Sequence, residues 1–317
     1  MIAFLLQQLI NALTVGAIYA LIALGYTMVY GVLKLINFAH ADLFMVGAYI
    51  SFFLMALLIG PLGGPLPILI VTVIFFATFA LVGLLGVAIE RAAYRPLRRS
   101  SRLAPMLSAL GMAIVLQNAV MLLAGRKPIV YPAIVSTEPI ELAGAVFTPK
   151  QAAIVVIAVL LMLLLTWFVH GTRLGIRIRA VSESGVTAQL LGINIDRTIS
   201  VIFFIGPGLG AVAGLLYASY YGVATFSMGF IVGLKAFTAA ILGGIGSIPG
   251  AMLGGFLLGL LETFGAGLLP SLTGGAIGPE YRDIFAFVIL IVVLIFKPAG
   301  LLGEAISEET LVYKKDY

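Results

Sequence analysis

The sequence contains no cysteine and only two histidines among its 317 residues. Without cysteine there can be no disulfide bond, no thiol nucleophile and no cysteine-ligated metal centre. His40 and His170 alone are too few for a histidine-based metal site or a catalytic triad. The patterns GxxxxGK[ST], HExxH and GxSxG do not occur either. We therefore expect no enzymatic activity, no catalytic residues, no cofactor and no bound metal.

Charge is also scarce, at 10% of residues against 62% hydrophobic residues and a mean hydropathy of +1.19. Soluble domains carry about 25% charged residues. Apolar runs of about 20 residues recur along the chain, which predicts an all-α integral membrane protein with a polytopic bundle of about 8–10 transmembrane helices. The candidate spans are residues 3–33, 38–59, 66–89, 103–124, 151–170, 199–222, 229–246, 251–269 and 281–297.

The basic residues are concentrated in two short loops that two candidate spans separate, so both loops lie on one side. Half of the 18 lysines and arginines are in these loops: Arg91, Arg95, Arg98, Arg99, Arg102, Arg173, Arg177, Arg179 and Arg197. Basic loops stay in the cytoplasm. This predicts an external N-terminus and a cytoplasmic C-terminus. A net charge of +5 spread between spans does not indicate nucleic-acid binding.

One domain accounts for the chain. We expect a transmembrane domain over 1–303 and a cytoplasmic tail over 304–317. Within the domain, 171–198 forms the long cytoplasmic loop and 125–150 the long external loop. The external loop contains IELAGAVFT, which predicts a small hairpin that turns at Ala143-Gly144.

The cytoplasmic loop contains one predicted helix, from about Ser182 to Leu191. Gly192 follows where a helix C-terminus favours a residue that tolerates positive φ. Val186 and Leu190 are four residues apart and share one side of this helix. Such a helix can lie in the membrane interface or dock into a groove of a soluble partner. An ordinary basic loop with a helical turn is the third reading.

Polar residues at membrane depth are costly and tend to face a path or a partner. Asn37, His40 and Asp42 interrupt the sequence between the first two spans. They form either a polar turn at the cytoplasmic boundary or part of a solute path. Gln117 and Asn118 lie inside the fourth span, where hydrogen bonds between helices or contact with a path would explain them.

A second polar feature is the glycine-rich break ILGGIGSIPG at 241–250, which Pro249 prevents from continuing as a regular helix. Gly243, Gly244 and Ser247 are here either in a tight cytoplasmic turn or in a broken or re-entrant helix whose backbone groups suit a zwitterionic solute. Lys235 and Glu262 lie in the neighbouring apolar segments, and they either pair or Lys235 reaches the outer surface. Glycines four residues apart, such as Gly210 and Gly214, predict close helix packing.

Four long blocks carry a family resemblance. They are INFAHADLFMVGAYIS at 36–51, ERAAYRPLRRSSRLAPMLSALGM at 90–112, RAVSESGVTAQLLGINIDR at 179–197 and GLKAFTAAILGGIGSIPGAMLGG at 233–255. Together the blocks resemble the LivH-type permeases of bacterial branched-chain amino acid ABC importers, in order, from about Thr14 to Gly303. The family commonly has glycine after the histidine of the first block, where this chain has Ala41.

The resemblance implies a multi-pass subunit of the bacterial inner membrane. Its partners would be a second homologous permease, two cytoplasmic ATPase subunits and a periplasmic binding protein that delivers leucine, isoleucine or valine. The stretch 179–197 would contact an ATPase, through Arg179, Ser182, Glu183, Val186, Ala188, Leu190 and Gly192. The candidate translocation path would include Asn37, His40, Asp42, Gln117, Gly243, Gly244 and Ser247.

Two other functions remain open at this point. An ion-coupled secondary transporter also uses broken helices and polar residues near the midplane, but the spans contain few acidic residues. A permease with the same ABC architecture could carry urea, short amides or other amino acids.

Overall fold

The computed structural model describes residues 2–62, 67–98, 100–101, 103–132, 138–142, 144–276, 278 and 281–303. The predicted tail 304–317, together with Arg99 and Arg102 of the first basic loop, lies outside the described residues. Within the described part, seven helices are long and apolar enough to cross a membrane, and two apolar helices are shorter. The predicted all-α polytopic fold is confirmed.

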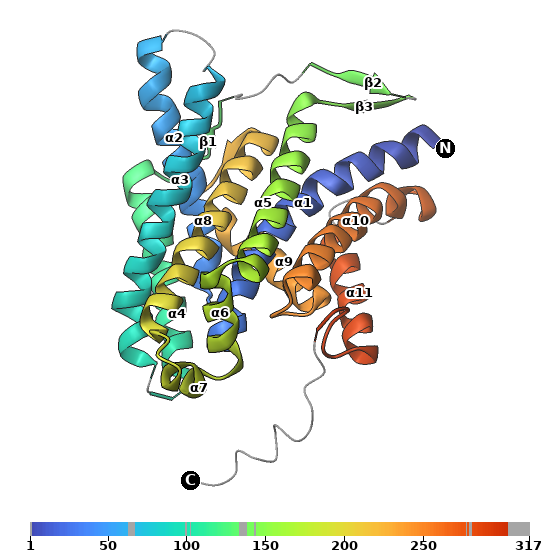
Figure 1. The fold of residues 1–317 in the computed structure, drawn as a ribbon. Coiled ribbons are helices and arrows are strands. Elements are labelled where there is room, and N and C mark those ends of the chain that lie inside the picture. The colour runs from blue at the N-terminus through green and yellow to red at the C-terminus, as the bar shows by residue number, and fades with distance from the viewer. Residues whose placement is uncertain are drawn as a thin grey trace.

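Each of the nine predicted spans corresponds to one helix of the structure (Figure 1). These helices are α1 Ile2–Leu33, α2 Ala39–Leu62, α3 Ile68–Ile89, α4 Leu103–Ala124, α5 Pro149–Gly171, α8 Ile195–Tyr221, α9 Met228–Gly243, α10 Ile248–Leu272 and α11 Arg282–Phe296. The basic loops contain a π-helical turn η1 Glu90–Tyr94, a 3₁₀ turn η2 Arg95–Leu97, and two short helices, α6 Arg173–Glu183 and α7 Gly185–Leu190.

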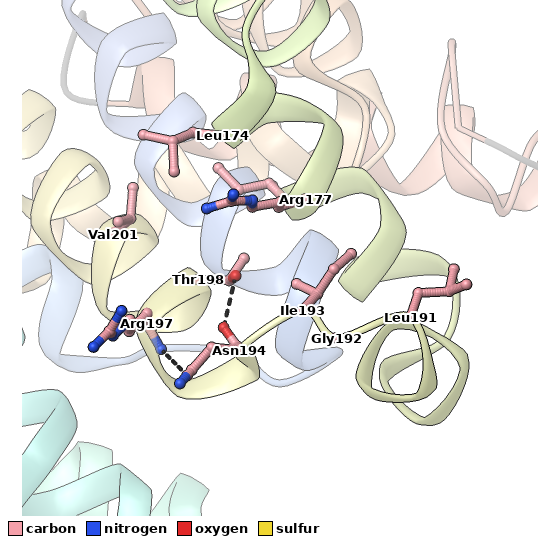
Figure 2. A pocket seen from close by; sticks show the side chains of 10 residues that line it. Leu174, Arg177, Leu191, Gly192, Ile193, Asn194, Arg197, Thr198 and Val201 are labelled. Carbon is pink, nitrogen blue, oxygen red and sulfur yellow. Dashed lines mark hydrogen bonds between the residues drawn. The ribbon is translucent and has the colours of Figure 1, made fainter.

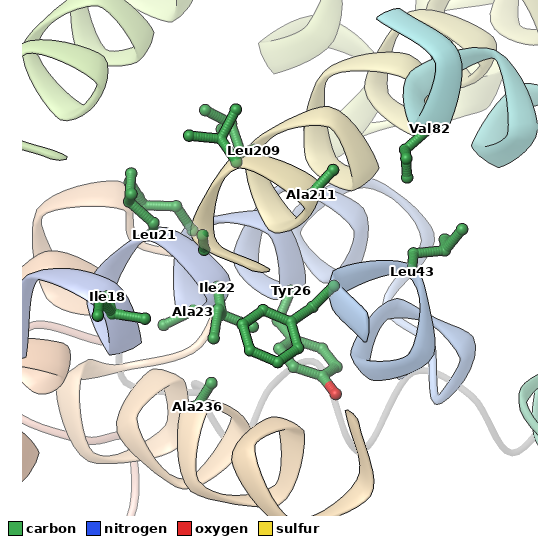
Figure 3. Packing of buried hydrophobic residues seen from close by; sticks show 14 of the residues in the cluster. Ile18, Leu21, Ile22, Ala23, Tyr26, Leu43, Val82, Leu209, Ala211 and Ala236 are labelled. Carbon is green, nitrogen blue, oxygen red and sulfur yellow. The ribbon is translucent and has the colours of Figure 1, made fainter. Parts of the chain in front are cut away.

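The first helix, α1, forms the centre of the bundle. Leu21 and Ile22 of α1 are fully buried; Leu21 lies on the side of Leu209 of α8, while Ala236 of α9 lies on another side of α1 (Figure 3). α10 packs closely along α1, because a Cβ atom added at Gly255 would lie 2.3 Å from Cα of Ala20. Without an apolar–water driving force between helices in lipid, such close backbone contact is a main source of association. The predicted glycine packing is confirmed.

The two ends of the bundle differ in structure. One end has the β2–β3 hairpin, of strands Ile140–Leu142 and Ala145–Phe147, and the start of α1 (Figure 1). The predicted hairpin is confirmed, with Gly144 at φ 80°. Two shorter strands, β1 Ile129–Val130 and β4 Val223–Ala224, pair beside the end of α8. The opposite end has α6, α7 and the η1–η2 turns.

The glycine-rich segment after α9 is a turn between two helices. α9 ends at Gly243, and Gly244 and Gly246 have positive φ values of 108° and 100°. Ser247 then caps α10 by accepting a hydrogen bond from the Gly250 N–H at 3.2 Å. The segment after α11 covers this turn, because the N–H of Leu302 donates to the carbonyl of Gly243 at 2.8 Å. These hydrogen bonds and the two positive φ values explain why the helix ends at Gly243 and a new helix begins at Ile248.

Candidate functional site

The arginine-rich loop folds into two helices, where the sequence predicted one. The N-terminal part is α6, whose buried residues Gly175, Ile178 and Val181 recur every three residues on one face. Ser184 interrupts the helix with extended backbone angles and caps α7 by accepting a hydrogen bond from the Thr187 N–H at 3.2 Å. The predicted helix at Ser182–Leu191 is therefore divided, with Ser182 at the end of α6.

α7 ends in a Schellman motif, as the glycine after it suggested. The N–H of Ile193 donates to the carbonyl of Ala188 and the N–H of Gly192 donates to the carbonyl of Gln189, both at 3.0 Å. Gly192 has a φ of 78°, a conformation that suits glycine. Asn194 then caps α8 by accepting from the Arg197 N–H at 3.0 Å. The hydrogen bonds of these two caps hold α7 to the start of α8 through a short connection.

The outer face of α7 is apolar and open. Val186, Leu190 and Leu191 are 74%, 83% and 74% exposed. Ala188 points the other way and is only 1% exposed, so it seats α7 on the bundle and does not reach the outer face. A six-residue helix with one inward alanine, two outward aliphatic residues and a third at its C-cap leaves an apolar surface uncovered.

A pocket of about 490 Å³ adjoins α7 (Figure 2). It lies between α6 and the connection from α7 to α8. Arg177 of α6 and Arg197 of α8 bring two guanidinium groups to its lining. The other lining residues are mainly apolar or uncharged: Leu174, Ile178, Leu191, Gly192, Ile193, Asn194, Thr198 and Val201. The pocket and the apolar face of α7 share Leu191, so they form one continuous surface.

Three further predicted contact residues lie at the end of α6. Glu183 and Arg179 are exposed, and Arg179 also reaches the backbone carbonyl of His170 at 3.5 Å. The Ser182 hydroxyl donates to the carbonyl of Arg179 at 2.8 Å within its own helix. Of the seven predicted contact residues, only Ala188 is buried.

An ionic cluster joins the two basic loops. The Arg98 guanidinium contacts the Glu90 carboxylate and lies 2.8 Å from the Asp196 carboxylate. Arg95 also pairs with Asp196, and the Ser200 hydroxyl donates to Glu90 at 3.0 Å. Burial lowers the pKa of Arg98, and the Asp196 carboxylate offsets part of that effect. The start of α8 is thereby tied to the turn between α3 and α4, which confirms that the two loops share one side.

The π-helical turn η1 links this cluster to the first predicted path residue. Glu90 begins η1 and Tyr94 ends it. The Tyr94 hydroxyl donates to Oδ1 of Asn37 at 2.5 Å. π-helical turns are rare and occur frequently at functional sites. The sequence did not single out Glu90 or Tyr94, although an acidic residue at the end of an apolar span was a visible signal.

Asn37, His40 and Asp42 do not form a surface turn. His40 is the second residue of α2, yet its Nε2 atom donates to the carbonyl of Ile22 at 3.2 Å. That carbonyl lies about 16 Å before the end of α1 at 1.5 Å per residue. A Cβ atom at Gly210, near the middle of α8, would lie 3.0 Å from the His40 ring. α2 therefore begins inside the bundle, which excludes a surface turn for His40, whereas Asn37 lies beside Tyr94 at the arginine-rich end.

The other predicted path residues lie elsewhere. Gln117 is half-buried on α4, and its neighbour Asn118 donates to the carbonyl of Ile114 in the same helix at 2.8 Å. Gly243, Gly244 and Ser247 belong to the α9–α10 turn, near Tyr30 at the end of α1. Asn37, His40 and Asp42 therefore share one segment of the structure, apart from the other predicted path residues. We call this segment, residues 34–42 from the end of α1 through the first turn of α2, the α1–α2 return.

The predicted pair of Lys235 and Glu262 is present. Lys235 Nζ lies 2.9 Å from the Glu262 carboxylate and 2.7 Å from the Asp283 carboxylate. The Tyr19 hydroxyl donates to the second Glu262 oxygen at 2.8 Å. This network connects α1, α9, α10 and α11. Asp283 was missed, because in the sequence it stands at the outer start of an apolar span, where a solvated carboxylate is common.

Comparisons with known proteins identify the family. The model of the family described as branched-chain amino acid transport system / permease component matches residues 8–294. The high-affinity branched-chain amino acid transport system permease protein BraD of Pseudomonas aeruginosa is 46% identical over 303 residues, which cover 94% of this chain and 96% of that protein. The corresponding permease protein LivH of Escherichia coli is 44% identical over 95% of this chain and 96% of LivH.

More distant relatives show how the likeness decreases. A probable branched-chain amino acid transport permease protein LivH of Methanocaldococcus jannaschii is 27% identical over 92% of this chain and 91% of that protein. The xylose transport system permease protein XylH of Escherichia coli is 36% identical over only 29% of this chain and 25% of XylH. No solved structure matched. The full-length matches leave no doubt about the assignment, and the chain belongs to the family of permease components of branched-chain amino acid transport systems.

Proposed function

We propose that this chain is the membrane-spanning permease subunit of an ABC importer for leucine, isoleucine and valine, and that α7 couples it to a cytoplasmic ATPase. The family and the names of the full-length relatives support branched-chain amino acids as the transported solutes. The main observation in favour of coupling through α7 is its exposed apolar face at the arginine-rich end.

α7 suits insertion into a groove of a soluble partner. Its caps at Ser184 and Gly192 keep a six-residue helix ordered, although an isolated helix of that length is unstable in water. Val186 and Leu190 would enter an apolar groove of the ATPase subunit. Arg177 and Arg197 in the adjoining pocket would meet acidic side chains at the rim of that groove. Glu183 and Arg179, both exposed at the end of α6, would add polar contacts.

Contacts between α7, α8 and η1 provide a route for the motion. α7 is fixed to α8 through Ala188 and the Schellman motif, so displacement of α7 moves the start of α8. Asp196 and Ser200 of α8 would carry that displacement to Glu90 through the ionic cluster. η1 would then move Tyr94, which is bonded to Asn37 in the α1–α2 return. This chain of contacts supports coupling between nucleotide-driven closure and the polar return at mid-depth.

The remaining partners follow the same proposal. A second homologous permease would complete the membrane pair, and a second ATPase subunit would complete the nucleotide-binding pair. A periplasmic binding protein would deliver the amino acid to the end that carries the β2–β3 hairpin. The arginine-rich end would be cytoplasmic. We confine the proposed path to the α1–α2 return, where Asn37, His40 and Asp42 lie together.

Val186→Asp and Leu190→Asp test the coupling. Both side chains are exposed, so a carboxylate there should leave the bundle intact while it opposes insertion into an apolar groove. We expect loss of co-purifying ATPase subunits and at least about a ten-fold loss of ATP-dependent leucine uptake, the effect of losing about 1.4 kcal/mol of coupling. Ala188→Asp is a poor test, because it would bury a charge.

Val130→Asp is the matched control. Val130 is 82% exposed in β1, at the opposite end of the molecule, and receives the same substitution. It should keep normal uptake and normal co-purification of ATPase subunits. Normal uptake in the two α7 variants, or an equal loss in the control, would contradict the proposed role of α7.

A further inference from the structure

Two helices begin side by side in the middle of the bundle. α2 starts at Ala39, at the depth of Ile22 and Gly210. α9 starts at Met228, and a Cβ atom at its second residue, Gly229, would lie 2.7 Å from the carbonyl oxygen of Ala41. The first turns of both helices therefore face each other at mid-depth. Each helix N-terminus has a partial positive charge of roughly half a unit.

Asp42 lies between these two first turns. It belongs to the first turn of α2, and its Oδ1 atom would be 2.9 Å from a Cβ atom at Gly229. Asp42 is only 6% exposed, and it makes no hydrogen bond or ion pair with the residues that the structure describes. Lys235, the cation on α9, is already held by Glu262 and Asp283. Asp42 is thus a carboxylate at membrane depth without a cationic partner in the described part of this chain.

Burial opposes the charge on this carboxylate, and positive potential or a bound cation would offset that cost. The two helix N-termini place positive potential beside it. Ser227, the N-cap of α9, accepts no side-chain capping hydrogen bond, so its hydroxyl does not occupy that end of the helix. Glycine at 229 leaves room for the carboxylate, since a side chain there would collide with Asp42. Two other buried polar atoms of the same return, Nδ2 of Asn37 and Nδ1 of His40, also have no partner among the described residues.

The proposed cargo supplies the missing cation. Leucine, isoleucine and valine differ in their apolar side chains and share an α-ammonium group. A carboxylate and a primary ammonium form a charge-assisted hydrogen bond, which is strong where water is scarce. We propose that Asp42 binds the α-ammonium group of the amino acid in transit, between the first turns of α2 and α9; this inference rests on the proposed function.

The first experiment measures uptake by the complete complex in proteoliposomes with leucine-loaded binding protein and ATP. Asp42→Asn keeps the shape and removes the charge, so we expect at least about a ten-fold fall in the maximal rate, as for a lost hydrogen bond to a charged group. Asp42→Glu should recover part of the rate. Thr72→Val on the exposed face of α3, where the hydroxyl bonds the carbonyl of Ile68 in the same helix, is the control and should have no effect.

The outcomes separate the two proposals. If the unmodified complex takes up no leucine with ATP, the proposed function fails. If it takes up leucine and Asp42→Asn does so equally fast, the role of Asp42 is overturned while the function stands. If Asp42→Asn loses assembly together with uptake, Asp42 is a structural residue and the inference is again overturned.

A second experiment keeps Asp42 and asks which chemical group is recognised. The chain has no cysteine, so Ser227→Cys places one thiol at the exposed N-cap of α9. In the full complex, leucine and 3-methylbutylamine should slow thiol labelling, since both carry the ammonium group. 2-Hydroxy-4-methylpentanoate, which lacks it, should not. Equal protection by the hydroxy acid, or protection by sodium ions alone, would overturn the assignment.

Discussion

At the scale of single residues, burial separates two arginines that contact the same carboxylate. Arg98 lies largely inside the bundle and is the ionic partner of Glu90, which is fully buried, whereas Arg95 is well exposed and pairs only with Asp196. Removing one member of a buried pair leaves an uncompensated charge, while an exposed pair contributes little. The two positions therefore form a natural comparison.

Arg98→Ala should destabilise the protein by about 3–5 kcal/mol, because the buried Glu90 carboxylate loses its counter-charge. Arg95→Ala should cost about 0.2–1 kcal/mol, because its pair with Asp196 is exposed to solvent. The thermal unfolding midpoint of the purified protein in detergent would measure both. Replacing both partners, in Glu90→Gln with Arg98→Met, should recover most of the loss. Equal midpoints for the two single variants would contradict this account of the cluster.

At the scale of secondary-structure elements, the long spans were predictable because each is a run of apolar residues bounded by polar or glycine-rich segments. α6 was not predicted as a helix, since Arg173, Arg177 and Arg179 suggested a loop. Its signal was the three-residue spacing of Gly175, Ile178 and Val181 on the buried face. The division at Ser184 depends on a side-chain cap that competes with the helix, which composition does not reveal.

The mid-depth start of α2 was beyond the sequence for a different reason. Polar residues between two apolar runs usually mark the membrane boundary. Here the space that receives His40 is made by Gly25 and Gly210, on helices distant in sequence. Side chains at those two positions would exclude the imidazole ring. The sequence therefore singled out His40 but did not reveal how deep its ring lies, because that depth is set by these tertiary contacts.

Gly175 sets the angle between α5 and α6. A Cβ atom there would lie 2.3 Å from the carbonyl oxygen of Val169 and 2.4 Å from that of Phe168, and backbone atoms cannot yield cheaply. Gly175→Ala should therefore displace α6 and α7 and reduce ATP-dependent uptake by about ten-fold or more, while membrane insertion stays normal. Gly185→Ala is the matched control, because its Cβ atom would be 3.8 Å from the nearest side chain. Normal uptake by Gly175→Ala would show that the α5–α6 angle does not matter for coupling.

At the scale of the whole molecule, the first and the last residues that the structure describes lie at opposite ends of the bundle. Ala3 contacts the position of Gly144 in the β2–β3 hairpin, whereas Leu301 and Leu302 bond to the end of α9 beside Gly244. An external N-terminus and a cytoplasmic C-terminus require this separation. The mid-depth start of α9 does not disturb it, because the chain enters α9 from the hairpin end and leaves it at the arginine-rich end.

Charge predicts which end faces the cytoplasm, and a cysteine-free chain allows a direct test. Val130 and Val186 are the same residue with similar exposure, 82% and 74%, at opposite ends of the bundle. A membrane-impermeant maleimide applied to intact spheroplasts should label Val130→Cys and leave Val186→Cys unlabelled until the membrane is opened. The physical reason is that the arginines beside α7 resist transfer across the membrane during insertion. Labelling of Val186→Cys in intact spheroplasts would place α7 outside, away from any nucleotide, and the coupling proposed for it would then be impossible.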